Sequence, residues 1–131
     1  MYNRADYENN LEQFCLKNNI SVVPYYSLAS GFLSGKYKSS ADSFKSPRGG
    51  GVISRYLDER GKRILKALEE VANHYSVGMA TIAIAWLAAR SSITAPIASA
   101  TNPEQLKELM MSTKIDMDDT SIQKLNDASS Y

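Results

Sequence analysis

Two loops of small residues carry the groups in this chain that could do chemistry, and that chemistry is the binding of an anion. The first loop, SLASG at 27–31, follows the apolar run ISVVPY at 20–25. The second loop, ASAT at 98–101, follows ITAPI at 93–97 and opens directly onto a helix start. In parallel-sheet proteins, a strand end, a tight loop and a helix N-terminus together present backbone N–H groups to a phosphate. Two such units predict a site for a nucleotide or another phosphorylated ligand.

The helix start after the second loop is the sharpest local signal. Asn102 is a favourable N-cap, and Pro103 suits the first helical position because it has no N–H to satisfy. Gln105 stands three residues after the cap, which resembles a capping box. Capping alone would explain these residues. The hydroxyls of Ser99 and Thr101, beside the positive end of the helix dipole, favour a bound anion as well.

Other kinds of chemistry have little support in the sequence. The single histidine, His74, and the single cysteine, Cys15, form neither a nucleophile–base pair nor a usual metal-ligand set. We read Cys15 as a buried thiol, and one cysteine allows no intrachain disulfide. The net charge of +1 gives no reason to expect a nucleic-acid binder. No run approaches the ~20 apolar residues of a membrane span, and we expect a reducing cytoplasm.

Helices and short strands must position these loops. Apolar residues recur at helical spacing in five segments: 5–18, 58–75, 79–90, 103–113 and 118–128. Residues 20–25 and 93–97 read as two short buried strands, although each contains a proline near its C-terminal end. Residues 26–57, rich in serine, glycine and tyrosine, are predicted to form one long mobile loop that covers the ligand. The whole chain, 1–131, reads as a single domain.

The segments VVPYYSLASGFLSGKY (22–37) and ITAPIASATNPEQLKEL (93–109) closely resemble the last two strand–loop units of the aldo-keto reductase family. The resemblance extends from Tyr2-Asn3 to Ala128-Ser129. It implies an α/β fold, a (β/α)8 TIM barrel, of which a complete copy needs about 250 residues. By this resemblance the chain is a C-terminal fragment, a helix-rich partial barrel with about two short strands.

The resemblance also implies a binding site for the dinucleotide NADP. Tyr25 would lie against the nicotinamide ring, and the backbone of 28–31 would pass the pyrophosphate. Lys36 and Arg48 would pair with phosphate oxygens, while the loop and helix start at 99–108 would hold the adenosine 2'-phosphate and adenine. The implied cofactor-binding residues are Tyr25, Tyr26, Leu28, Ala29, Ser30, Gly31, Lys36, Arg48, Ser99, Thr101, Gln105 and Glu108. From the residues alone, core packing of Tyr25 and Tyr26 and a solvated charge at Lys36 remain the alternatives.

The implied activity is that of an oxidoreductase, which reduces a carbonyl to an alcohol. The family uses a tyrosine acid with a lysine, an aspartate and usually a histidine, and none of these maps onto this chain. We therefore expect no catalytic residues here, no metal, and no reduction by the isolated chain. The alternative is a non-catalytic binding or oligomerisation module derived from a half-barrel. Either way, the expected partners are the missing N-terminal half of the barrel or a second copy of the chain.

Overall fold

The computed structural model describes all 131 residues, and helices are its only regular elements. The α-helices are α1 (Glu12–Lys17), α2 (Gly49–Tyr56), α3 (Glu59–Tyr75), α4 (Met79–Ala88), α5 (Pro103–Met111) and α6 (Asp119–Ala128). Shorter turns of 3-10 or π helix are η1 (Tyr7–Leu11), η2 (Ala29–Ser34), η3 (Ser40–Lys45) and η4 (Ser112–Lys114). None of the helices combines the length and hydrophobicity that crossing a bilayer requires.

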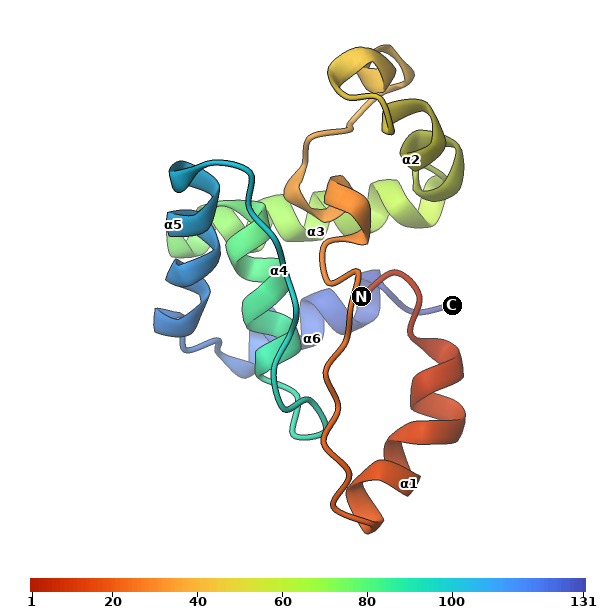
Figure 1. Cartoon of the computed structure of the whole chain (residues 1–131), viewed down its shortest axis with the longest axis vertical. Helices are drawn as coiled ribbons and strands as arrows, with labels where there is room; N and C mark the ends of the chain where they lie inside the picture. Colours follow the sequence, from red (N-terminus) through yellow and green to blue (C-terminus); the bar gives the residue numbers. More distant parts are fainter.

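The hydrophobic core lies where α3, α4 and α6 pack together (Figure 1). Helix α4 is apolar on nearly every side, and all its residues from Ala80 to Leu87 are buried. Helix α3 turns one apolar stripe inward, and Asp58 caps its start by accepting a hydrogen bond of 2.7 Å from the Gly61 N–H. Four of the five predicted helical segments, at 58–75, 79–90, 103–113 and 118–128, are confirmed as α3 to α6.

The prediction of two strands is wrong in this structure. Residues 20–25 and 93–97 instead run side by side as irregular chain (Figure 1). Two backbone hydrogen bonds join them: the Thr94 N–H donates to Val22 O at 2.8 Å, and the Ile97 N–H donates to Pro24 O at 3.0 Å. Pro24 and Pro96 have no N–H to extend the pairing, and an isolated pair of segments has no further neighbours to stabilise a ladder. The two segments lie beside each other as neighbouring parallel strands would, but they lack the regular hydrogen-bond ladder of a sheet.

The segment predicted as one long loop, 26–57, contains the three short helices η2, η3 and α2. Glycine disfavours a helix by intrinsic propensity, yet Gly49 to Gly51 begin α2. Helices η3 and α2 lie together at one end of the molecule, above α3 in Figure 1. The mobility expected for this segment remains a prediction.

The first predicted helix, 5–18, forms a π turn followed by the short α1, and it stands apart from the core (Figure 1). No residue of η1 or α1 is buried. Leu11 and Phe14 expose 54% and 58% of their surface, and Cys15 is only partly buried. The expected buried face of this helix, including a buried Cys15, is therefore not formed, because no other helix packs an apolar face against it.

Candidate functional site

A cavity of about 490 Å³ opens between the N-terminal segment and the chain around Tyr25. Trp86 and Leu87 of α4 line its inner side, and most of the lining residues are apolar. Three predicted cofactor residues, Tyr25, Tyr26 and Ala29, belong to its wall. A cavity of this size and character is of the kind that holds small ligands.

The two tyrosines form an exposed aromatic pair. Tyr25 and Tyr26 leave 74% and 65% of their surface accessible, and their ring centroids lie 4.9 Å apart at an angle of 48°. The alternative of ordinary core packing is therefore wrong for both residues. Exposed rings beside a cavity offer a stacking surface for a flat ligand.

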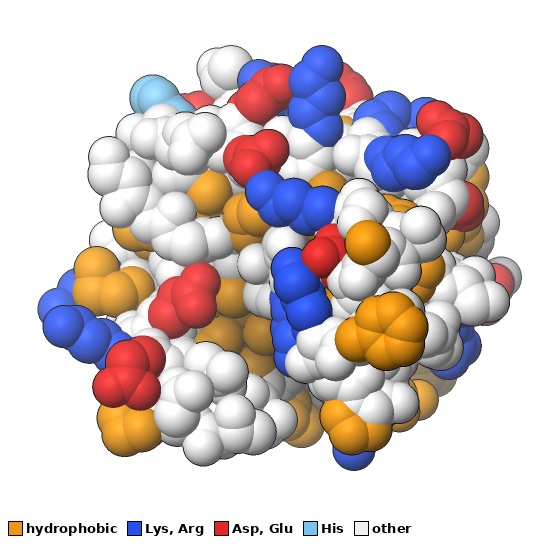
Figure 2. Space-filling view, turned by 90° about the horizontal axis from the view of Figure 1, so that it is seen from above, with side chains coloured by type: hydrophobic (Ala, Val, Ile, Leu, Met, Phe, Trp, Pro, Cys, Tyr) orange, Lys and Arg blue, Asp and Glu red, His pale blue; other side chains and the backbone are white.

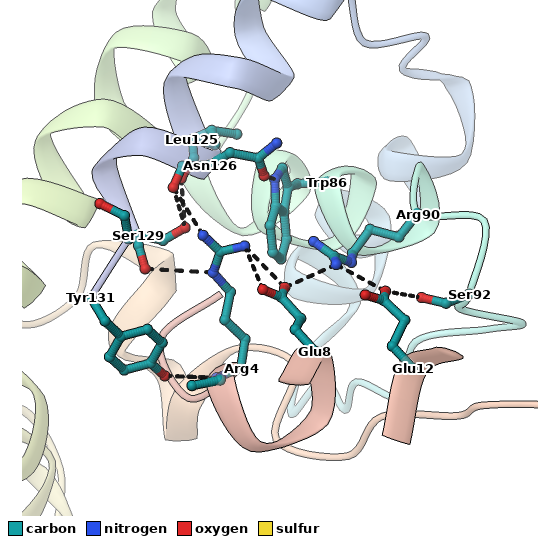
Figure 3. Close-up of polar contacts among 12 residues, drawn as sticks. Arg4, Glu8, Glu12, Trp86, Arg90, Ser92, Leu125, Asn126, Ser129 and Tyr131 are labelled. Atoms are coloured by element: carbon teal, nitrogen blue, oxygen red, sulfur yellow. Dashed lines mark hydrogen bonds and ion pairs between the residues drawn. The ribbon is translucent and has the colours of Figure 1, made fainter. Parts of the chain in front are cut away.

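A network of charged side chains borders the same cavity through Arg4, Glu8 and Arg90 (Figure 3). Arg4 donates to both Glu8 carboxylate oxygens at 2.9 and 3.0 Å, and also to Asn126 O at 3.0 Å. Arg90 lies 2.9 Å from Glu8 and 3.0 Å from Glu12, so it joins the two carboxylates. The network ties η1 and α1 to the end of α4 and to α6. Reasoning from sequence missed it.

Glu12 is held in its charged form within this network. Partial burial raises the pKa of Glu12, but hydrogen bonds from the Ser92 hydroxyl, at 2.6 Å, and from Arg90 outweigh that effect. The net result is a pKa below the ordinary value of 4.5. Glu8 and Glu12 together satisfy the charges of Arg4 and Arg90.

The first small-residue loop has an unusual backbone. Ala29, Ser30 and Gly31 all have positive φ, at 48°, 57° and 89°. Residues with a side chain rarely take this left-handed conformation, which costs roughly 1–2 kcal/mol each. Strain of this kind clusters at ligand-binding segments. Leu28 precedes the run and accepts from the Gly31 and Leu33 N–H groups, so the loop is tightly closed.

The second loop forms half of the predicted capping box: Asn102 caps the helix, but the Gln105 side chain bonds Thr101 rather than the Asn102 N–H. Asn102 Oδ1 accepts from the Gln105 N–H at 2.8 Å, and Gln105 Oε1 accepts from Thr101 N and Oγ1 at 3.0 and 3.1 Å. Gln105 and Thr101 therefore contact one another. Ser99 is exposed on the same loop. The Glu108 carboxylate lies against Gly78, directly before the N-terminus of α4, where the helix dipole favours a negative charge.

The predicted cofactor residues do not all meet in one cavity. Lys36, Arg48, Ser99, Thr101, Gln105 and Glu108 are outside the wall of the cavity that Tyr25 lines. Lys36 and Arg48 are exposed, with the Lys36 ammonium 5.4 Å from the centroid of the Tyr37 ring. Seen from above, the surface is hollowed between the side that carries α5 and the side that carries η3 and α2, with hydrophobic side chains in the floor and charged ones at the rim (Figure 2). The site as a whole remains a prediction.

Comparison with known proteins gives consistent matches. The model of the aldo/keto reductase family matches residues 1–130. The aldo-keto reductase yakc [NADP(+)] of Schizosaccharomyces pombe is 27% identical over 117 residues, which are 87% of this chain and 34% of that protein. The L-glyceraldehyde 3-phosphate reductase of Escherichia coli K12 is 30% identical over 96 residues, 70% of this chain and 28% of that protein.

A solved structure has the same fold. The crystal structure of the thermostable aldo-keto reductase Tm1743 with the inhibitor epalrestat superposes with a TM-score of 0.67 at 23% identity. The match covers 97% of this chain and 36% of that one. The chain thus spans about a third of the length of the curated relatives named above, which cover 34% and 28%.

Proposed function

This chain belongs to the aldo/keto reductase family, and from that premise we propose that it is the C-terminal, NADP-binding part of a cytoplasmic reductase of aldehydes or ketones. The yakc relative is named for NADP(+), which supports the choice of cofactor. The order of the two small-residue loops and the final helices supports the C-terminal assignment. In the complete enzyme, NADPH would supply hydride to the carbonyl carbon.

The observation that carries the proposal is the left-handed run from Ala29 to Gly31. It turns the chain sharply beside Tyr25, at the loop that the resemblance assigns to the pyrophosphate. Tyr25 would hold one face of the nicotinamide ring. The backbone of the run would lie against the phosphates, where a bulky side chain at Gly31 would obstruct the approach.

The second half of the proposed site is the start of α5. Asn102 and Gln105 fix the loop, and Ser99 and Thr101 place hydroxyls beside the helix N-terminus. This end carries partial positive charge and suits the adenosine 2'-phosphate. Lys36 would pair with another phosphate oxygen, since no acidic partner neutralises it here.

A thermal-shift titration with NADP⁺ and NAD⁺ tests this proposal. We expect NADP⁺ to raise the melting temperature more than NAD⁺, although the affinity will be weak because the rest of the barrel is missing. Lys36→Ala should weaken NADP⁺ binding about tenfold, the scale of one charge-assisted contact. Lys17→Ala, on the exposed last turn of α1, is the matched control. Equal, or absent, shifts with both dinucleotides at millimolar concentration would contradict the proposal.

The isolated chain should lack reductase activity. No residue of this chain matches the tyrosine acid of the family or the lysine and aspartate that tune it, so no group here would protonate the carbonyl oxygen. NADPH oxidation by the pure chain, followed at 340 nm with a panel of aldehydes, should equal the rate without protein. A reproducible excess over that rate would show that this expectation is wrong.

A second candidate function, a non-catalytic oligomerisation module, is favoured by one observation. Leu11 and Phe14 on the first helix, and Val23 and Ile97 on the paired segments, are all about half exposed. Such apolar side chains have no partner within one chain and mark a surface for association.

A further inference from the structure

The charges along the wall of the 490 Å³ cavity do not balance. Three arginines, Arg4, Arg55 and Arg90, line it, while Glu8 is the acidic residue in its wall. Arg4 and Arg90 are both engaged by carboxylates. Arg55 forms no ion pair or hydrogen bond, and its guanidinium lies only 5.6 Å from the centroid of the neighbouring Tyr56 ring.

Arg55 is well placed to act on a ligand. It stands in the last turn of α2, on an exposed position, with its side chain at the cavity. An unpaired guanidinium presents donors in a planar fork that matches a carboxylate. Because the rest of the wall is mostly apolar and includes exposed aromatic rings, the cavity suits a flat molecule with one anionic group.

The cofactor does not account for Arg55. The side chains assigned to the NADP phosphates are those of Lys36, Arg48 and the start of α5, and none of them lines this cavity. Tyr25, Tyr26 and Ala29 are the members of the cofactor set that border it. Tyr25 is assigned to the nicotinamide ring, which bears no phosphate, and Ala29 would meet the pyrophosphate through its backbone alone. The positive charge of Arg55 is therefore left to bind the second reactant, the carbonyl substrate.

We propose that Arg55 binds the carboxylate of the substrate, and that the reductase acts on flat, apolar carbonyl compounds that carry one carboxylate. This inference rests on the proposed function, because the bound carboxylate is a substrate only if the complete protein is a reductase. The presence of an anion site at Arg55 rests on the cavity alone. Arg55 is a binding residue here, and no bond is made or broken at it.

The test uses the whole chain and two alcohols that correspond to the reduced products, since alcohols do not form imines with lysines. The binding of 4-(hydroxymethyl)benzoate and of the neutral benzyl alcohol is measured by isothermal titration calorimetry. We expect the carboxylate to bind at least tenfold more tightly than the neutral alcohol. Arg55→Gln should remove this difference and leave the affinity for benzyl alcohol unchanged, whereas Arg55→Lys should keep part of it.

Controls separate the possible failures. Lys17→Gln removes a positive charge from α1, away from the cavity, and should leave both affinities unchanged. Circular dichroism of Arg55→Gln checks that the fold is kept. Equal affinities for the two alcohols, or an unaltered preference in Arg55→Gln, would overturn the proposal. If NADP⁺ fails to bind while the Arg55-dependent preference persists, the proposed reductase function fails and the anion site stands.

Discussion

Ser30 holds a backbone conformation that its side chain disfavours, with φ at 57° and ψ at 30°. Glycine adopts this left-handed region freely, although it also loses more entropy on folding. Ser30→Gly should therefore raise the free energy of unfolding by about 0.5 kcal/mol, the relief of strain less the entropy cost. Urea denaturation measures this change. Ala89→Gly, at a right-handed position with φ of −71°, should instead lower stability, and an equal loss in both variants would exclude strain at Ser30.

The carboxylate of Glu12 makes the fold sensitive to acid. Its pKa is lowered in the folded chain, so its contribution is complete above the ordinary pKa of 4.5 and is lost as the pH falls through the folded value. Glu12→Gln should cost about 1–2 kcal/mol at pH 7, the scale of hydrogen bonds to a charged group.

The pH dependence separates this effect from a packing defect. Measured by urea denaturation from pH 7 down to pH 3, the difference between wild type and Glu12→Gln should shrink as the carboxylate becomes protonated. A difference that stays constant over this range would mean that the charge of Glu12 contributes nothing.

Residue-level prediction succeeded where partners are close in sequence. The contact between Asn102 and Gln105 spans three residues and follows from local capping rules. The contact between Glu12 and Arg90 spans 78 residues, and no local pattern marks it. Arg55 is likewise recognisable only from the cavity that it lines, because its sequence neighbourhood resembles any exposed helix.

Helix α2 begins with three glycines, which makes it the least stable helix by intrinsic propensity. A methyl group at Gly50 would meet nothing within 4 Å, so Gly50→Ala should stabilise the chain by about 0.5–1 kcal/mol. At Gly49 the new group would collide with the Ser43 carbonyl, and Gly49→Ala should cost about 1–3 kcal/mol. Urea denaturation of the two variants compares them directly, and stabilisation by both would mean that η3 does not pack on α2 as described.

At the scale of elements, periodicity predicted helices with a buried face better than any other feature. Helices α3 and α4 carry long apolar patterns that bury themselves in the core. The two strands failed for a different reason: their β-branched residues are suited to a sheet, but a sheet needs neighbours that this chain does not supply. Residues 20–25 and 93–97 keep only two backbone hydrogen bonds to each other, and a third from the Val22 N–H to the Thr94 hydroxyl.

The whole molecule corresponds in extent to 36% of the reductase structure on which it superposes. In a barrel, both edges of the paired segments would be covered by further strands. Here those edges remain open, and α1 has no sheet to pack on. The sequence could predict the family and the core helices, but it could not predict how a chain of this extent arranges the surfaces that a complete barrel would bury.

These open surfaces should make the chain associate with itself. Exposed apolar side chains beside unpaired backbone favour edge-to-edge pairing between copies. Size-exclusion chromatography with light scattering should give a mass above that of one chain, rising with concentration. Replacing Phe14 and Val23 by lysine should weaken the association at least tenfold, because each buried apolar side chain is worth about 1.5–3 kcal/mol. Phe44→Lys, at an apolar side chain that is 94% exposed on η3, is the control and should leave the mass unchanged. A single-chain mass for the wild type at all concentrations would mean that the open edges are not a surface for self-association.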